Sequence, residues 1–300
     1  MKIKKTLPRK IFLFFNFIVL AVMALLCVLP FINLLAISFS SKTAVSSGKV
    51  TFFPVEFTTA AYDFILNSAA FGRALFISVQ RAFVGVLVNL LLIILTAYPL
   101  SKRKLQFRAR SFYSWYFVIT ILFSGGLIPS YLMVRNTNIM DSVWALVLPG
   151  ALPVFSMLVV MNYMRNLPIE LEEAAYIDGA NHFQTLLKVI LPVSTPTLAT
   201  VTLFSFVGHW NSWFDGMIFM NKIENYPLQS YLQTVVVNPD AFFRNIANAN
   251  TSGVAAYLEL TNARTTNAAQ LFLATIPILC VYPFLQKYFT TGLVMGSVKG

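Results

Sequence analysis

Charged side chains are scarce in this sequence. They make up 11% of its residues, against about 25% in an ordinary soluble domain, while 57% are hydrophobic and the mean hydropathy is +0.71. The charges cluster and leave uncharged stretches at 11–41, 82–101, 111–134, 142–164, 189–214 and 265–286. Each stretch supplies the roughly 20 residues that a helix needs to cross a bilayer, and each is too long for a barrel strand. The sequence therefore predicts an all-α membrane protein with six transmembrane helices.

Groups that carry catalytic or metal chemistry are also few. The sequence has two histidines and two cysteines, with no Cys/His cluster at metal-ligand spacing. It has neither the GxxxxGK[ST] loop that cradles phosphates nor a Gly-x-Ser-x-Gly elbow. We therefore expect no catalytic residue, no metal and no cofactor bound by this chain. Cys27 and Cys280 fall in apolar stretches, so we expect buried thiols and not a disulfide.

Acidic residues are absent from all six apolar stretches. A carrier driven by protons or sodium ions usually keeps ionisable groups or discontinuous helices at mid-membrane. Their absence argues against an ion-coupled secondary carrier, and the missing nucleophiles argue against a membrane-embedded enzyme. If the protein moves a solute against a gradient, the energy comes from another subunit.

Basic residues are distributed unevenly along the chain. Two clusters flank short segments: Lys2, Lys4, Lys5, Arg9 and Lys10, then Lys102, Arg103, Lys104, Arg108 and Arg110. Because such clusters stay on the cytoplasmic side, we predict that both termini are cytoplasmic. The formal net charge of +11 then reflects membrane topology and not a nucleic-acid partner. Arg73 and Arg81, near the outer end of the second helix, either face a water-filled path or extend to lipid headgroups, and we favour the headgroups.

The predicted helices and loops form one domain over 1–300. The helices cover about 11–39, 72–100, 111–133, 141–164, 194–219 and 266–289, with a cytoplasmic loop at 165–192 and an extracytoplasmic loop at 221–264. Gly125, Gly126 and Pro129 favour a break or kink in the third helix. The outer loop contains the Asn-rich segment NIANANTSG, and it is either a contact site for a partner or a simple connector.

The loop 165–192 concentrates the acids that the apolar stretches lack. Glu170, Glu172 and Glu173 follow a proline that suits the first turn of a helix, whose positive end favours acids. Gly179 suits the left-handed turn that ends such a helix, and an amphipathic pattern follows over 183–190. The pair of short helices either docks on a cytoplasmic protein or lies on lipid. The acids favour docking, because inner leaflets are anionic.

The spacing in this loop resembles the EAA loop of bacterial ATP-binding cassette (ABC) importer permeases. The family pattern is E-A-A-x3-G-x9-I-x-L-P, and Val189 replaces the isoleucine here. The segments GHWNSWFDG, YPLQSYL and GSVKG are similar to the carbohydrate-uptake branch. Within that branch the chain resembles the second permease of importers for oligosaccharides such as alginate or pectin fragments. The resemblance covers nearly the whole chain.

The resemblance implies a type I ABC importer permease, a multi-pass protein of the bacterial cytoplasmic (inner) membrane. Such a subunit forms a heterodimer with a second permease and works with two cytoplasmic ATPase subunits, which bind ATP and Mg. An extracytoplasmic solute-binding protein delivers the sugar or oligosaccharide. The residues implied to couple the chain to the ATPase are Glu173, Ala174, Ala175, Asp178, Gly179, Leu191 and Pro192. The alternatives are a permease for another solute class and an ion-coupled secondary carrier.

Two further sets of residues are predicted to meet ligands. A substrate path is predicted at Trp210, Asn211, Trp213 and Asp215, because aromatic faces and amides suit sugar rings and hydroxyls. The tryptophans fit an interfacial aromatic belt equally well. In the related maltose importers, a loop at the position of 221–264 contacts the binding protein. Contact is therefore predicted there, at Asn245, Asn248 and Asn250.

Overall fold

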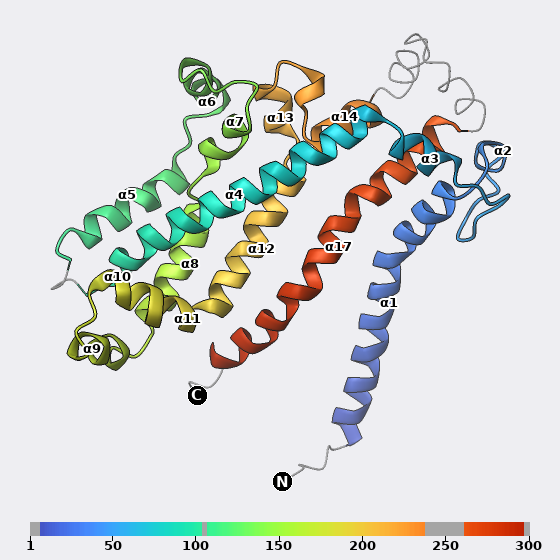
Figure 1. Cartoon of the computed structure of the whole chain (residues 1–300). Helices are drawn as coiled ribbons and strands as arrows, with labels where there is room; N and C mark the ends of the chain where they lie inside the picture. The colour runs from blue at the N-terminus through green and yellow to red at the C-terminus, as the bar shows by residue number, and fades with distance from the viewer. Residues whose placement is uncertain (1–6, 104–106, 238–260, 297–300) are drawn as a thin grey trace. The chain divides into compact units, whose positions relative to one another are not determined.

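A computed structural model describes residues 7–103, 107–237 and 261–296, with the side chains of the last helix described as far as 281 and at 283. Every regular element in these residues is helical (Figure 1). The chain divides into two compact units, Met1–Ala69 with Thr234–Ile276, and Ala70–Gln233 with Pro277–Gly300. The predicted binding-protein contacts at Asn245, Asn248 and Asn250 lie outside the described residues.

The first unit is built on a long apolar helix, α1 (Leu7–Ser38). Two short helices follow, α2 (Lys42–Ser46) and α3 (Ala60–Leu66), and α17 (Ala263–Gly296) begins here. The ring of Phe39 stacks on Phe57 and Tyr62 at centroid distances of 5.3 and 4.6 Å. The Asn262 amide donates to Ser46 Oγ at 3.1 Å, so contacts between distant segments hold the unit together.

The second unit is a bundle of long and broken helices. Its long member is α4 (Ala69–Ser101), and α8 (Val154–Arg165) and α12 (Thr195–Asn211) run beside it (Figure 1). Its core forms where α4, α8 and α12 meet a turn of π-helix, η2 (Leu186–Ile190). The buried side chains at this junction include Ile93, Ala97, Met157, Val160, Leu186, Ile190 and Val201. The core therefore ties the loop after α8 directly to the long helices.

Three helix pairs are bent at short breaks. The pair α5 (Arg110–Leu122) and α6 (Leu127–Asn136) turns by 113°, and Gly126 at the break has φ +86°. The break expected around Gly125–Pro129 is therefore present. The segment of α7 (Val143–Val147) and η1 (Leu148–Gly150) turns by 51° into α8. The segment of α10 (His182–Thr185), η2 and α11 (Leu191–Val193) turns by 81° into α12.

Membrane spans can be counted from these helices. Within the described residues, α1 and α4 are each long and apolar enough to cross a membrane, and the three bent pairs raise the number to five if each is one span. The chain is thus a helical membrane protein. The sixth span, which falls in α17, and the cytoplasmic position of both termini stay predictions.

Several local features differ from the expectations. The segment 194–219 is two helices, because α12 ends before Ser212 and α13 (Phe214–Phe219) begins after Trp213. The early part of 221–264 is helical, as η3 (Ile223–Asn225) and α14 (Leu228–Val237), and its contact with a partner stays a prediction. Cys27 and Cys280 are free thiols, but both are exposed on the chain. The expectation of buried thiols is wrong because an apolar stretch also presents side chains to lipid.

Candidate functional site

The loop after α8 folds into a short exposed helix, α9 (Glu170–Ile177). Glu170, Glu172 and Glu173 occupy its first turn, where the helix dipole favours acids. The turn at Gly179 has φ +83°. The Gly179 N–H bonds to the Tyr176 carbonyl at 3.0 Å, and the next N–H bonds to the Ala175 carbonyl at 2.9 Å. These two bonds form the Schellman turn that ends a helix, so the predicted glycine cap is confirmed.

The outer face of α9 is open. Glu173, Ala174 and Asp178 are exposed, and Ile177 is 86% exposed. Ala175 is buried, so the two alanines do not share one face, because adjacent helical residues point about 100° apart. The open face of α9 therefore carries the Glu173 and Asp178 carboxylates, a small alanine and the apolar side chain of Ile177.

The inner face of α9 is tied to the end of α4. Lys102 Nζ lies 2.6 Å from Glu172 Oε1 and 3.8 Å from the centre of the Tyr98 ring. Burial lowers the pKa of the Lys102 ammonium, while the hydrogen bond and charge of Glu172 oppose that shift. The Tyr98 hydroxyl donates to the His182 carbonyl at 3.2 Å, and Tyr176 Oη lies 2.8 Å from His182 Nδ1. Polar contacts therefore join α9 and α10 to the end of α4.

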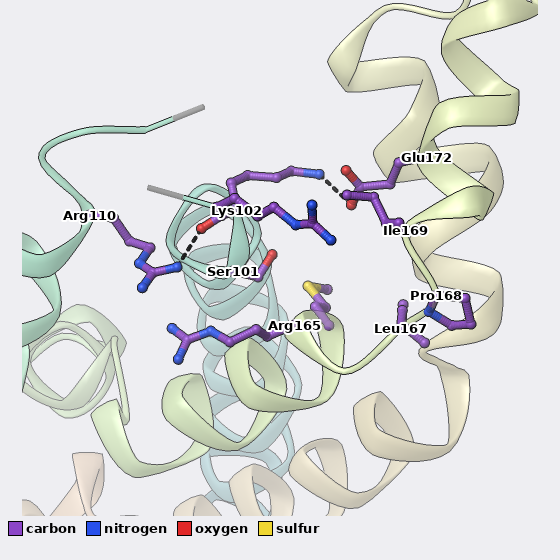
Figure 2. A pocket seen from close by; sticks show the side chains of 10 residues that line it. Ser101, Lys102, Arg110, Arg165, Leu167, Pro168, Ile169 and Glu172 are labelled. Carbon is purple, nitrogen blue, oxygen red and sulfur yellow. Dashed lines mark hydrogen bonds and ion pairs between the residues drawn. The ribbon is translucent and has the colours of Figure 1, made fainter. Parts of the chain in front are cut away.

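A basic cavity of about 260 Å³ lies beside this ion pair (Figure 2). Arg110 donates to the Lys102 carbonyl at 2.7 Å, and Arg165 donates to the Leu100 carbonyl at 3.4 Å. The carbonyls at the end of a helix lack partners within it, and the dipole favours cations there. The arginines therefore cap α4 and hold its end against α5 and α8.

The last two residues predicted for coupling lie behind α9. Leu191 is half-buried and packs on the core of the second unit, and Pro192 follows it in α11, ahead of the 81° bend into α12. They thus position the loop and do not belong to the open face of α9.

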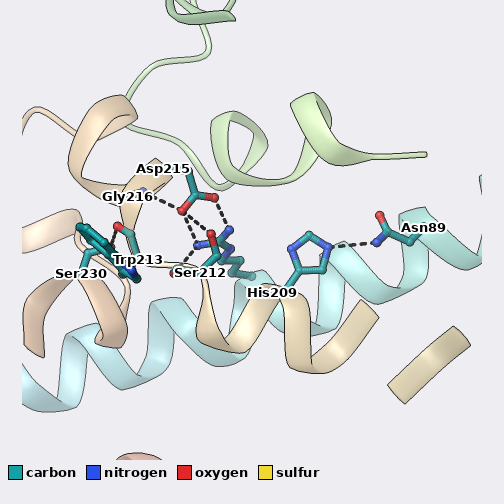
Figure 3. A network of polar contacts seen from close by, with 8 residues as sticks. Asn89, His209, Ser212, Trp213, Asp215, Gly216 and Ser230 are labelled. Carbon is teal, nitrogen blue, oxygen red and sulfur yellow. Dashed lines mark hydrogen bonds and ion pairs between the residues drawn. The ribbon is translucent and has the colours of Figure 1, made fainter. Parts of the chain in front are cut away.

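A second polar site lies between α4, α12 and α13 (Figure 3). The Arg81 side chain is 2% exposed and forms an ion pair with Asp215. The same carboxylate accepts from Ser212 Oγ at 2.8 Å and from the Gly216 N–H at 2.9 Å. The expectation that Arg81 extends to headgroups is therefore wrong, because a carboxylate 134 positions away neutralises it inside the bundle. Arg73 is exposed and lies 3.6 Å from Glu224.

The network continues along α4 and α12. The Asn89 amide lies 3.2 Å from both Ser205 Oγ and His209 Nε2. When the amide nitrogen points instead at the carbonyls of Gly85 and Ala151, at 3.1 and 3.0 Å, its oxygen accepts from both of those side chains. Asn89 then bonds to a carbonyl at the break between η1 and α8, which no helix bond satisfies.

A cavity of about 330 Å³ borders this network. Arg81, Asn89, Ser156, His209 and Asp215 are among its lining residues, and the broken segment at Pro149–Pro153 forms one wall. Of these, only Asp215 was expected from sequence. Arg81 and Asn89 lie eight residues apart on α4, and Ser205 and His209 lie four apart on α12, with Ser212 directly after its end. This helical spacing of polar residues was the missed signal.

The predicted path residues do not gather at one place. Trp210 is buried and borders a different, apolar cavity with Val79, Phe83 and Phe206. Asn211 is exposed and Trp213 is 41% exposed. In the part of the chain that the structure describes, no group of His, Cys, Asp and Glu is placed to hold a metal ion.

Long apolar helices, bent helix pairs and an open helix fixed to the bundle define a membrane protein of the transporter-permease class. No family model matches the chain. It is 36% identical over 281 residues to the polygalacturonan/rhamnogalacturonan transport system permease protein YtcP of Bacillus subtilis (strain 168). The aligned region covers 94% of this chain and 96% of the relative. The chain belongs to the ABC transporter permeases, in the branch whose named members serve sugar and oligosaccharide transport.

Solved structures agree with this assignment. The fold matches a chain of a bacterial ABC transporter that imports the acidic polysaccharide alginate, with a TM-score of 0.86, 30% identity and coverage of 96% of this chain and 100% of that one. A chain of an alginate ABC transporter in complex with a pentasaccharide-bound periplasmic protein matches at a TM-score of 0.54 and 15% identity, over 91% and 92% of the two chains. The second likeness shows only the fold.

Proposed function

We propose that the chain is the permease subunit of an ATP-driven oligosaccharide importer in the bacterial cytoplasmic membrane. It spans the membrane six times with both termini inside. It forms the translocation path with a second permease as a heterodimer and hydrolyses no ATP itself. Two cytoplasmic ATPase subunits bind ATP and Mg, and an extracytoplasmic binding protein delivers the solute. The relatives named for polysaccharide transport support the substrate class.

The observation that carries this proposal is α9. Its outer face is open at Glu173, Ala174 and Ile177, while its inner face is fixed to α4 by Lys102 and Glu172. A helix that is open on one side and fixed on the other can receive a push from a partner and pass it into the membrane bundle. We propose that the ATPase binds this outer face, with Glu173 against a basic side chain of the partner.

The proposal is tested by Glu173→Lys in the assembled transporter. We expect oligosaccharide uptake and binding-protein-stimulated ATP hydrolysis to fall at least tenfold, because the reversed charge meets a basic partner, while membrane insertion is unchanged. Glu170→Lys makes the same charge change one turn earlier on the exposed helix, and we expect it to keep most of the activity. Normal stimulated hydrolysis in Glu173→Lys contradicts the docking assignment.

The alternatives are separated with unmodified protein. An ion-coupled carrier takes up solute without the ATPase subunits and stops when ionophores collapse the gradient. In proteoliposomes, uptake by the proposed importer requires ATP and is unchanged by ionophores. A panel of oligosaccharides, amino acids and peptides then tests the solute class.

Two sets of residues stay predictions within this function. Trp210, Asn211, Trp213 and Asp215 are proposed for the substrate path, although only Asp215 borders the polar cavity. The segment 221–264 is proposed to contact the binding protein. Deleting residues within 240–252 is expected to weaken productive engagement of the binding protein, and unchanged transport kinetics would contradict that role.

A further inference from the structure

We infer that the polar cavity bordered by Asn89, Ser156 and His209 binds one ring of the passing oligosaccharide through its hydroxyl groups. The inference rests on the proposed import function and adds a contact site within this subunit. The site lies between α4, the η1–α8 break and α12–α13, away from α9.

The cavity has the size and lining of a small-molecule site. Its volume of about 330 Å³ falls at the lower end of the range for ligand pockets. Its polar groups come from α4, α8, α12 and α13, and the apolar Phe204 and Phe219 also line it. A few convergent polar groups among apolar walls are the usual lining of such pockets.

The charges at this site are already matched. Asp215 accepts hydrogen bonds from Arg81, Ser212 and the Gly216 N–H, and Arg81 also donates to the Ser212 carbonyl at 3.1 Å. The pair has no net charge to recognise a carboxylate, although Arg81 Nε is buried without a hydrogen-bond partner among the residues that the structure describes. The ligand group that fits is therefore a neutral hydroxyl, even when the oligosaccharide carries acidic groups elsewhere.

Other polar atoms at the cavity are available. Within the described residues, Ser156 Oγ forms no hydrogen bond, and His209 uses only Nε2, toward Asn89. A hydroxyl can both donate and accept, so a sugar hydroxyl satisfies either atom. These atoms give the cavity a chemical preference for polyhydroxylated solutes.

The wall of the cavity is irregular backbone. The segment Leu148–Gly150 and Pro153 interrupt the helix with a 51° bend. At membrane depth, non-helical backbone is tolerated where it lines a cavity, and Pro/Gly-interrupted segments often border transporter binding sites. The break and the spaced polar residues therefore point to the same place.

Two glycines allow a clean test. An added Cβ at Gly208 or Gly150, which both line the cavity, meets no atom within 4 Å, and the same holds at Gly72, which lies on α4 outside it. In the assembled transporter, Gly208→Leu and Gly150→Leu should each reduce uptake at least tenfold and leave stimulated ATP hydrolysis within about twofold. Gly72→Leu should behave as wild type.

The outcomes separate the inference from its alternatives. Normal uptake in both filled variants overturns it. Loss of heterodimer assembly in both also overturns it, because the cavity would then be packing surface for the second permease. Absence of ATP-driven oligosaccharide uptake by the wild-type transporter contradicts the proposed function itself.

A finer variant tests the chemistry. Ser156→Ala should raise the KM for uptake about fivefold with kcat little changed, since one neutral hydrogen bond changes binding two- to tenfold. Ser156→Thr keeps the hydroxyl and should restore the KM. An equal KM in all three proteins would show that this hydroxyl does not contact the sugar and would overturn the assigned lining.

Discussion

Lys102 and Glu172 form an ion pair that joins the end of α4 to α9, with 2.6 Å between Nζ and Oε1 and side-chain exposures of 8% and 15%. The two residues are 70 positions apart. The Tyr98 ring lies under the ammonium, so the pair is shielded from water on one side. This contact fixes α9, the helix proposed to face the ATPase, to the membrane helix α4.

The first prediction concerns the strength of this pair. Lys102→Met or Glu172→Gln should each destabilise the protein by about 2 kcal/mol, because each leaves a largely buried charge without its partner. The charge swap Lys102→Glu with Glu172→Lys should recover part of the loss. Thermal unfolding in detergent and a double-mutant cycle measure the coupling.

The exposed pair of Arg73 and Glu224, at 3.6 Å with exposures of 56% and 73%, is the matched control. Its coupling should be below about 0.5 kcal/mol, since exposed pairs contribute little. Equal coupling energies for the two pairs would contradict the idea that burial makes the Lys102 contact strong.

The second prediction concerns the approach of α4 to α12 at Gly85. A Cβ there would lie 2.4 Å from His209 Nε2, so Gly85→Ala forces the ring away. Overpacking of this kind costs about 1–3 kcal/mol, and the better helix propensity of alanine offsets less than 1 kcal/mol of it. We expect Gly85→Ala to lower the Tm and Gly72→Ala to cause no decrease in Tm. Adding His209→Ser to Gly85→Ala should recover part of the lost Tm.

The third prediction is a pH dependence at Asp141, outside the membrane helices. Burial alone would raise the pKa of this carboxyl, but hydrogen bonds from the Asn221 and Lys222 N–H groups, at 2.7 and 3.3 Å, and from the Asn221 amide outweigh it, so the pKa is lowered. A depressed acid pKa stabilises the fold above the unfolded value of about 3.9. That stability is lost as the pH falls through the folded pKa.

Asp141→Asn is the variant for this test, because asparagine also tolerates the φ of +57° found here. At pH 7 it should unfold more easily by about 1 kcal/mol, allowing for solvent screening at a partly exposed site. The difference in Tm from wild type should shrink as the pH falls below about 4. A difference that stays constant between pH 7 and pH 3 would mean that the charge contributes nothing.

The parts of the fold that sequence could predict are those governed by local pattern. The long apolar run predicts α4, and Gly179 predicts the end of α9, because hydropathy and backbone freedom are properties of short segments. The pairing of Arg81 with Asp215 joins residues 134 positions apart, and no local pattern encodes it. A charge beside an apolar run is therefore predicted to reach headgroups, whereas the packing of α4 against α12 and α13 supplies a partner inside the bundle.

That pairing gives the last prediction. Arg81→Met alone leaves the Asp215 carboxylate without its main partner, and Asp215→Leu alone leaves a buried guanidinium, so each should cost about 3–5 kcal/mol and lower the folded yield. The double variant removes both charges, and apolar replacements of similar volume are often neutral, so folding should recover. Recovery of folding without uptake would show that the pair serves transport. If Arg81 instead reached lipid headgroups, Asp215→Leu would leave stability unchanged, and that result would refute the pairing.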